Sequence, residues 1–427
     1  MLWGPRKEGA GRSSKTKTLV GVMTRKQGSD KNGNSPFRAL TLALAGTLGV
    51  GNIVGVSAAI YLGGFGSIFW MWVSAFCAMI LKYAEIVLAM RHRRFDQGGR
   101  PHGSAMLYIK DFFASLGLYK LAKYIPIIFA LLCIVNSISM GSMIQINAVT
   151  SSFESVFGIS PLIVGIFLSI IVAIIVSRGS DGISRLTEIL VPLMSLGYII
   201  LSVAVMILRR DILSDAFYSI FRSAFSSESA ASGILGFLLS RALRYGTMRG
   251  LVSNEAGCGT APAAHATSNA QSAVEQGFWG IFEVFVDTIV LCTMTAIVVI
   301  ISYPSVRHFG NNFIMMTISA YSAVLGDFAK YFLAIAVFCF AFATVICWAH
   351  YGIESTRYLS DTKVAIKIFV IVYSLSVASG SLISSDFIWD CADFAIGAMT
   401  LINVTVICFM SKEVREATKF YFNTKSR

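Results

Sequence analysis

Glycine-rich stretches interrupt two segments of this chain that are otherwise apolar enough to cross a membrane. The first interruption is residues 46–52 (GTLGVGN), and the second runs over residues 246–259 (GTMRGLVSNEAGCG) in the other half of the chain. In hydrocarbon, the freed N–H and C=O groups of an unwound helix need partners, so unwinding persists only where it lines a cavity or binds a ligand. A pair of broken helices, one in each half, is typical of the binding site of a secondary transporter.

The composition favours a chain that lies mostly in lipid. Of its 427 residues, 55% are hydrophobic and 14% are charged, whereas soluble proteins carry roughly 25% charged residues. Apolar runs recur that are long enough to cross about 30 Å of hydrocarbon, which takes about 20 residues each. We therefore predict an all-α, polytopic membrane protein whose partner is the lipid bilayer.

The net charge of +12 raises the alternative of nucleic-acid binding, but the distribution of the charge argues against it. Basic residues gather in the first forty positions, at 91–94, at 178–185, at 357–367 and in the tail from Lys412. Ten crossings that begin inside place all of these on one side, as the positive-inside rule requires. The prediction is that both termini are cytoplasmic and that no nucleic acid is bound. Arg209, Arg210 and Arg222 fall on the other side and weaken the pattern.

The apolar runs predict about ten spans in two groups of five. The expected elements are a broken helix at 37–62, spans near 66–90, 122–150, 160–177 and 186–208, a second broken helix at 232–262, and spans near 277–303, 328–358, 363–380 and 387–410. Shorter amphipathic or interfacial stretches are expected at 105–118 and 311–325. Each half has the same order, and because five is odd, the second half enters from the opposite side. This predicts a 5+5 inverted repeat.

These expected spans divide the chain into five parts. They are a basic cytoplasmic tail (1–36), a first repeat (37–208), an external loop (209–231), a second repeat (232–410) and a basic cytoplasmic tail (411–427). The leader lacks the apolar core of a signal peptide.

Broken helices offer bare peptide groups to a ligand. The N-terminus of a half-helix attracts a carboxylate, and the freed carbonyls of the other half-helix suit Na⁺. An amino acid, which carries both a carboxylate and an ammonium group, would satisfy both ends. The alternative is that the glycines only let helices approach closely.

Three side chains inside the spans have two interpretations each. Gln145 either makes an interhelical hydrogen bond or contacts a ligand. Thr344 either binds sodium or bonds back to its own helix. Trp348 lies four residues later on the same helix face, where it is either a wall of a small pocket or part of the packed core.

Intramembrane carboxylates are functional candidates by default. The candidates are Glu85, Glu188, Glu255, Glu283 and Asp287. Lys82 lies one turn before Glu85, and neutralisation of Glu85 by this lysine is the alternative for that acid. Glu255 and Asp287 either support the second break, as gating or ion-coupling groups, or carry protons, which keeps proton coupling open. The chain carries no paired-histidine zinc motif, nucleophile elbow or P-loop, and its eight cysteines form no CxxC. We predict that it is not an enzyme.

Four stretches of the chain resemble the alanine or glycine:cation symporter family, also called sodium:alanine symporters, which has a leucine-transporter-type fold. They are SPFRALTLALAGTLGVGNIVG from Ser35, RGLVSNEAGCGTAPAAHATS from Arg249, VFVDTIVLCTMTAIV from Val284 and FAFATVICWAHYG from Phe340. The resemblance covers nearly all of the chain after Ser35.

The resemblance implies sodium-coupled symport of alanine, D-alanine or glycine across a plasma membrane of the bacterial inner-membrane type. It implies substrate contacts from Thr47, Gly51, Asn52, Gln145, Met248, Leu251 and Trp348. It also implies a sodium ion held by the carbonyls of Ala45 and Leu48 and the hydroxyl of Thr344. No organic cofactor and no obligate protein partner are expected.

The chain departs from the family at several points. The family's extra helix before the S-P-F motif has no counterpart in the polar leader, and Ala343-Thr344 stands where Ser-Thr is frequent. The first rival function is a proton-coupled or exchange amino-acid permease of the same fold. A channel, a substrate-sensing receptor and an intramembrane hydrolase are further alternatives.

Overall fold

The computed structural model, which describes residues 33–96, 98–225, 241–383 and 385–425, begins with a broken helix. Helix α2 (Pro36–Thr47) starts at Ser35, whose hydroxyl accepts a hydrogen bond from the amide of Arg38 at 3.1 Å. Serine before a helix and proline at its first position are both favoured starts. After Leu48 and Gly49 the chain makes a short 3₁₀ turn, η1 (Val50–Asn52), and continues as α3 (Val54–Gly63). The two parts are bent by 61°.

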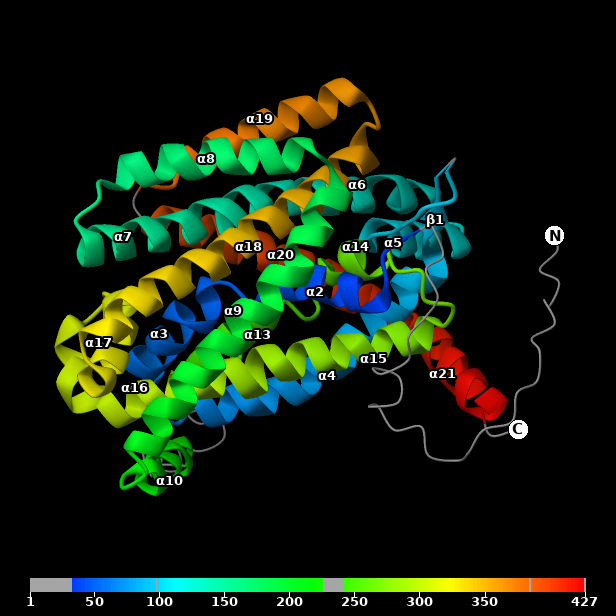
Figure 1. The fold of residues 1–427 in the computed structure, drawn as a ribbon. Coiled ribbons are helices and arrows are strands. Elements are labelled where there is room, and N and C mark those ends of the chain that lie inside the picture. Colours follow the sequence, from blue (N-terminus) through cyan, green and yellow to red (C-terminus); the bar gives the residue numbers. More distant parts are fainter. Residues whose placement is uncertain (1–32, 97, 226–240, 384, 426–427) are drawn as a thin grey trace.

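Helices continue through the rest of the first half (Figure 1). They are α4 (Ser67–His92), α5 (Ala105–Ser115), α6 (Tyr119–Ile138), the π-helical segment η2 (Ser139–Ile144), α7 (Gln145–Phe157), α8 (Pro161–Ser177), α9 (Ser180–Leu208) and α10 (Leu213–Ala224). A short antiparallel pair, β1 (Arg94–Phe95) and β2 (Pro101–His102), connects α4 to α5.

The second half follows a similar order. Its elements are α13 (Arg241–Asn254), α14 (Ala261–His265), α15 (Ala273–Val284), the π-helical segment η3 (Phe285–Cys292), α16 (Thr293–Val306), the 3₁₀ turn η4 (Arg307–Phe309), α17 (Phe313–Leu325), α18 (Asp327–Leu359), α19 (Lys363–Ser379), α20 (Ser385–Phe409) and α21 (Ser411–Lys425). Helix α18 runs diagonally through the bundle, beside α2, α6, α7 and α9 (Figure 1).

The predicted all-α membrane architecture is confirmed. Within the described residues, six helices are long and apolar enough to cross a membrane, and the bent pair α2 and α3 makes a seventh; α8 and α17 are shorter apolar helices. The described helices follow the order of the expected spans, while the number of about ten crossings stays a prediction. The inverted relation of the two halves stays a prediction.

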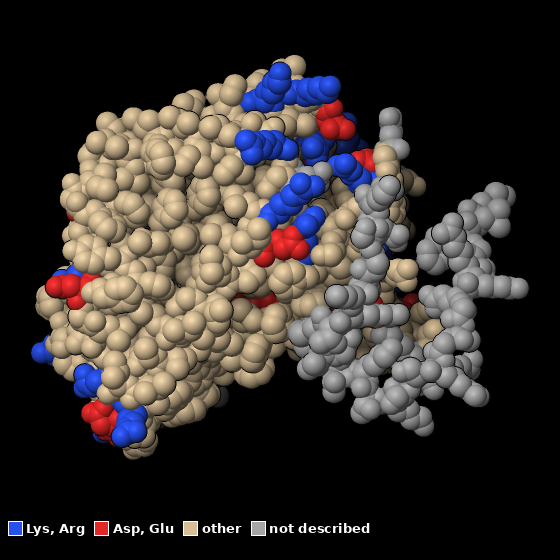
Figure 2. All heavy atoms as spheres, viewed as in Figure 1, with Lys and Arg blue, Asp and Glu red and all other residues tan. Residues whose placement is uncertain are grey.

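The outer surface suits a lipid environment. Figure 2 shows a broad band of uncharged atoms between two charged ends, with many Lys and Arg side chains at the end where the chain terminates. Apolar side chains are exposed on the outer helices, including Phe167 on α8 (60% exposed) and Ile189 on α9 (71%). Apolar area of this kind faces hydrocarbon in a membrane protein.

Two parts of the structure differ from the predicted organisation. The expected external loop contains α10, and the expected C-terminal tail is helical as α21. Residues 226–240, which include the end of that loop and the start of the expected span 232–262, lie outside the described residues.

The second break falls later than its first glycines suggested. Helix α13 runs without interruption through Gly246 and Gly250 and ends at Asn254, and the chain is non-helical over residues 255–260. A Cβ on Gly246 would lie 2.1 Å from the carbonyl oxygen of Ser67, and one on Gly250 would lie 2.7 Å from the hydroxyl of Ser74. These two glycines therefore allow α13 to pack closely on α4, which was the alternative interpretation of the glycine-rich stretches.

Candidate functional site

Oxygen atoms converge where the first break meets α18. The hydroxyl oxygen of Thr344 lies 2.9 Å from the carbonyl oxygen of Ala45 and 3.4 Å from that of Leu48. It also lies 3.0 Å from the carbonyl of Phe340 on its own helix. One hydroxyl proton cannot serve three acceptors at once, so these atoms form an oxygen-rich group that suits a small hard cation. The three residues assigned to sodium by resemblance thus lie together.

The backbone amides of the first break are covered by side-chain oxygens. Gly49 N–H donates to Oδ1 of Asn52 at 3.1 Å, and Val50 N–H donates to Oε1 of Gln145 at 3.0 Å. The Gln145 amide in turn donates to the carbonyl of Met140 at 3.2 Å, within the π-helical turn that precedes it. The glycine-rich break predicted bare N–H groups here, but in the structure neutral side chains accept hydrogen bonds from both. Gln145 therefore makes an interhelical hydrogen bond to the backbone of the first break.

Glycine is required at position 49 because the neighbouring side chains touch its backbone. A Cβ there would lie 2.8 Å from the Thr344 hydroxyl and 3.0 Å from Oε1 of Gln145. Both distances are shorter than van der Waals contact. The glycine therefore lets the two polar side chains reach the unwound turn from α18 and α7.

A buried carboxylate anchors the other side of the first break. Asn52 Nδ2 donates to Oδ1 of Asp287 at 2.7 Å, and the Ser253 hydroxyl donates to Oδ2 at 3.0 Å. The Thr288 hydroxyl donates to the same oxygen at 2.7 Å. All four residues are fully buried or nearly so. These hydrogen bonds connect the first break and α13 to η3 through the carboxylate of Asp287. A single buried acid surrounded by neutral donors can hold a monovalent cation or a proton.

Trp348 contacts the second break. Its indole N–H donates to Oε1 of Glu255 at 3.1 Å, and Oε2 of that carboxylate accepts from the Thr260 hydroxyl at 2.7 Å. Trp348 is 1% exposed, and a Cβ added at Gly141 would lie 2.3 Å from the Cβ of Trp348. Trp348 is therefore fixed between the π-helical turn η2 and the unwound residues 255–260.

Two further residues assigned to the substrate lie in the first glycine-rich stretch, Thr47 and Gly51. Thr47 is buried, with its hydroxyl 3.4 Å from the carbonyl of Leu44 in its own helix. Gly51 approaches α13: a Cβ on it would lie 3.8 Å from Cα of Ser253. The first break and α13 are thus adjacent at this position.

The remaining two assigned residues lie on α13. Met248 and Leu251 are partly buried. Leu251 packs with Ala75, Ala78 and Val284, in a small apolar cluster that is separate from the main core. The structure therefore brings Asn52, Gln145 and the sodium-assigned residues together, and places Leu251 against α4 and α15.

Two polar residues near the breaks, Ser253 and Asn403, were not predicted from the sequence as site residues. Ser253 and Asn403 make buried hydrogen bonds to the acids Asp287 and Glu85. Lys82, considered above as a partner of Glu85, forms its ion pair with Glu283 at 3.1 Å. For Ser253 the signal was present, since it stands in the S-N-E stretch that carried the resemblance. For Asn403, only the folded structure shows the partner.

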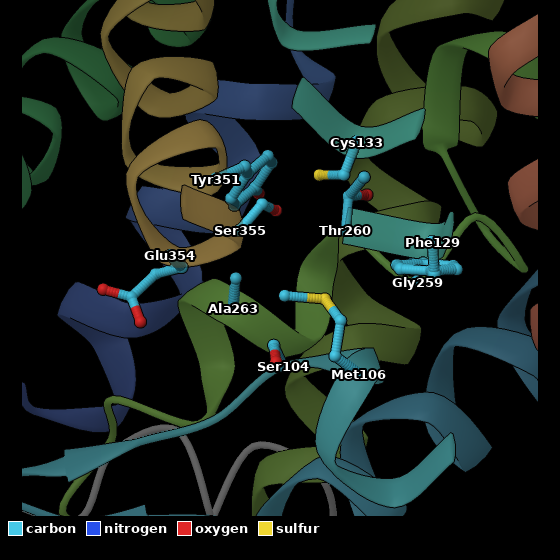
Figure 3. Close-up of a pocket in the computed structure, with 10 residues that line it drawn as sticks. All are labelled: Ser104, Met106, Phe129, Cys133, Gly259, Thr260, Ala263, Tyr351, Glu354 and Ser355. Atoms are coloured by element: carbon cyan, nitrogen blue, oxygen red, sulfur yellow. The ribbon is translucent and has the colours of Figure 1, made fainter. Parts of the chain in front are cut away.

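A small hollow, with about 10 Å³ of space for the centre of a water molecule, lies beside the second break, between α5, α6, α14 and α18 (Figure 3). Gly259, Thr260 and Tyr351 line it, and Glu354 lies at its edge with its carboxylate turned away from the other labelled side chains. That carboxylate is bound to Arg357 at 2.6 Å. The described lining contains none of the residues assigned to the substrate or to sodium.

The comparison with known families fits this geometry. The profile of the sodium:alanine symporter family matches residues 11–427. The chain belongs to this family. Membership identifies a multi-pass membrane protein that is a sodium-coupled amino-acid symporter and not an enzyme, with Na⁺ as the coupling ion.

Relatives of this symporter support the assignment over almost the whole chain. It is 34% identical to the sodium/alanine symporter AgcS of Methanococcus maripaludis over 391 residues, which are 91% of this chain and 84% of the relative. It is 33% identical to the probable sodium/glutamine symporter GlnT of Bacillus subtilis, over 92% of this chain and 80% of the relative.

Solved structures confirm the fold. The structure of MhsT in complex with L-phenylalanine superposes with a TM-score of 0.64, 15% identity and 90% coverage of each chain. A Na⁺-coupled sialic acid symporter superposes with a TM-score of 0.59 and 14% identity, over 88% of this chain and 79% of the other. This symporter therefore has the leucine-transporter-type fold predicted from its sequence.

Proposed function

We propose that this symporter carries a small neutral amino acid, alanine, D-alanine or glycine, into the cell together with Na⁺ by alternating access. The observation that carries the proposal is the position of the Thr344 hydroxyl, which lies against the Ala45 and Leu48 carbonyls at the end of α2. A sodium ion among these oxygens joins α18 to the first broken helix. Its binding therefore favours one arrangement of the two elements, which is what coupling requires.

The substrate occupies the same break in this proposal. Its carboxylate takes the place of Oε1 of Gln145 at the Val50 amide, and the released Gln145 amide then binds the substrate. The substrate-contacting residues are Thr47, Gly51, Asn52, Gln145, Met248, Leu251 and Trp348. Because an added methylene in a tight apolar pocket costs about 1–3 kcal/mol, a site enclosed by Trp348, Met248 and Leu251 selects small side chains. The names of the relatives AgcS and GlnT support an amino acid of this neutral class.

The orientation follows from the charged end of the molecule. Arg91, Arg93 and Arg94 end α4 at the same side as the C-terminal helix α21, where Figure 2 shows the gathered basic residues. By the positive-inside rule this end faces the cytoplasm, and the protein lies in the plasma membrane with both termini inside. The 5+5 inverted repeat fits this orientation because it gives each half the opposite direction.

Uptake of radiolabelled alanine into proteoliposomes tests the proposal. An inward sodium gradient should drive accumulation, and a panel of unlabelled amino acids should rank the substrates. Equal uptake with and without the gradient would refute sodium coupling. Competition by large side chains equal to that by alanine would refute the small substrate.

A matched pair of variants on α18 tests the sodium site. Thr344→Ala removes the hydroxyl that faces α2, whereas Thr356→Ala removes one that bonds only to the Gly352 carbonyl of its own helix at 2.8 Å. We expect Thr344→Ala to raise the sodium concentration for half-maximal uptake by about tenfold, equivalent to about 1.4 kcal/mol, and Thr356→Ala to leave it unchanged. An equal response of the two variants would remove Thr344 from the site.

Proton coupling within the same fold is the second candidate. It is favoured by the buried carboxylate of Asp287, whose described partners Asn52, Ser253 and Thr288 are all neutral. Alanine uptake driven by a pH gradient in sodium-free vesicles would support this candidate. Uptake that follows only the sodium gradient assigns Asp287 to the sodium-dependent process.

A further inference from the structure

Glu85 connects three elements to the unwound part of the second broken helix. It lies on α4 and is 0% exposed. Its Oε1 accepts hydrogen bonds from the Gly259 amide at 2.9 Å and from Nδ2 of Asn403 on α20 at 2.5 Å. The same Asn403 amide group donates to the Gly257 carbonyl at 2.9 Å, and its oxygen accepts from the Tyr108 hydroxyl on α5. One carboxyl group therefore holds the break, α4, α20 and α5 in a single network.

The second oxygen of this carboxyl group has no partner. Oε2 of Glu85 is buried and makes no hydrogen bond of normal geometry to a described residue, with the Gly257 backbone close to the carboxyl group. Burying a charged oxygen without a donor is strongly unfavourable, so such a group takes up a proton instead. The hydrogen-bond pattern thus fits a neutral carboxyl group, with Oε1 as the acceptor and Oε2 as the protonated oxygen.

Lys82, the cation that acts on Glu85, is shared with another acid. On α4, Lys82 lies one turn earlier, but its ammonium group is bound to Glu283 of α15 at 3.1 Å. The other oxygen of Glu283 is 3.0 Å from Nε2 of His265 on α14. On the unwound segment itself, Glu255 adds another buried acid.

The other titratable groups facing Glu85 are neutral hydrogen-bonding side chains. They are Tyr108 of α5 and Cys258 of the unwound segment, and both are buried. The described surroundings therefore contain more acids than cations, and the one lysine is already paired. A proton is the smallest species that balances this excess.

We propose that Glu85 is a proton-binding site, separate from the sodium and substrate sites, that is protonated while residues 257–259 are closed against α4 and α20 and gives its proton to water when they separate. Gly259 lines the hollow beside the break, so movement of this segment admits water to the carboxyl group. Closure is then linked to proton uptake, and opening to release. The release step rests on the alternating access proposed above; the protonation of the closed state does not.

Infrared spectroscopy of the purified full-length protein tests the protonation. The wild type near neutral pH should show the carbonyl-stretch band of a protonated carboxyl group, and Glu85→Gln should lose that band. Glu85→Asp should shift it, which assigns the band independently if the glutamine variant fails to fold. Glu154→Gln, at an exposed position near the end of α7, should leave it intact. Identical carboxyl bands in the wild type and both Glu85 variants would overturn the proposal, since an ionised Glu85 with a bound water predicts that result.

Transport measurements test the linkage to opening. Glu85→Gln imitates a permanently protonated group, so it should still bind alanine while uptake falls about tenfold, within the usual range of coupling between sites, and loses its dependence on internal pH. Wild-type uptake rates and pH profile in this variant would overturn the linkage. If the wild type itself shows no sodium-driven uptake, the proposed function fails, and the infrared result still decides whether Glu85 holds a proton.

Discussion

The two broken helices of this symporter are stabilised by different chemistry. At the first break, only Leu48 and Gly49 separate α2 from the following 3₁₀ turn. The groups that touch its backbone are neutral, an amide from Gln145, an amide from Asn52 and a hydroxyl from Thr344.

At the second break, residues 255–260 are unwound and the backbone turns through left-handed conformations. The φ angles are +53° at Glu255, +84° at Gly257 and +78° at Gly259. Here the partners are acids: Glu85 accepts from the Gly259 amide, and Glu255 accepts from Thr260 and Trp348.

The difference indicates a division of tasks. Neutral oxygens and amides can be exchanged for those of a sodium ion and a zwitterion at little cost, so the first break suits reversible binding. Buried carboxyl groups commit the second break to a fixed network unless their protonation changes. The first break therefore fits ligand exchange, and the second fits control of closure.

The largest expected effect compares a glycine in each break. A Cβ at Gly259 would lie 2.7 Å from Phe129 and 2.9 Å from Ala105, at a positive φ, whereas one at Gly51 meets only Cα of Ser253 at 3.8 Å. We expect Gly259→Ala to destabilise the fold by about 2–4 kcal/mol, from overpacking and left-handed strain. Gly51→Ala should unfold like the wild type. Thermal unfolding in detergent measures both, and equal melting temperatures would contradict the distinction between the breaks.

An intermediate effect is expected from the one acid that serves the first break. Asp287 accepts hydrogen bonds from three side chains, and Asp287→Asn replaces one of its two acceptor oxygens by an NH₂ donor, so either Asn52 on Oδ1 or Thr288 on Oδ2 loses its acceptor. We expect the sodium concentration for half-maximal uptake to rise by about tenfold or more. The exposed Asp327→Asn, which loses only its contact to Lys330, is the matched control. A normal sodium dependence in Asp287→Asn would show that the first break works without any carboxylate.

The smallest effect concerns α21, which packs on the end of the helix that carries Glu85. Hydrogen bonds from His92 and then Arg91 lower the pKa of Glu413 to about 2, against the opposing effect of partial burial. Because the pKa is lowered, the stabilisation of α21 by ionised Glu413 is complete above the ordinary pKa near 4.5. It is lost as the pH falls toward 2. Hydrogen exchange of the α21 amides, corrected for intrinsic rates, should therefore stay slow down to about pH 5. It should rise in more acid solution.

Glu413→Gln should speed this exchange at neutral pH by no more than about fivefold, because partly exposed ion pairs contribute about 0–1 kcal/mol. Faster exchange already near neutral pH in the wild type would contradict the lowered pKa. No change in the variant would show that α21 is held by its other contacts, such as the Tyr83–Thr418 hydrogen bond of 2.6 Å.

Hydropathy alone predicted the long spans well, because burial in lipid demands unbroken apolar runs. The span expected at 328–358 is α18 (Asp327–Leu359), and the one expected at 387–410 is α20 (Ser385–Phe409). Helices α10 and α21 were not predicted, because their mixed polar and apolar sequences contain no long apolar run and hydropathy alone does not distinguish them from loops.

The position of the second break could not be deduced from glycine content. Gly246 and Gly257 are the same residue in the same stretch, yet one packs a straight helix on α4 and the other turns the chain at positive φ. Only the neighbouring helices distinguish these uses. For the site, Thr344 was assigned by resemblance, whereas the pairing of Asn403 with Glu85, 318 positions apart in sequence, depends on tertiary contacts.

The ion pair between Lys82 and Glu283 has a consequence for biosynthesis. The two residues are 201 positions apart, so a ribosome inserts α4 with its lysine long before the partner acid has been made. A lone lysine at mid-helix costs about 2.5–3.5 kcal/mol during insertion. Insertion of α4 therefore carries this cost until α15 supplies the partner acid.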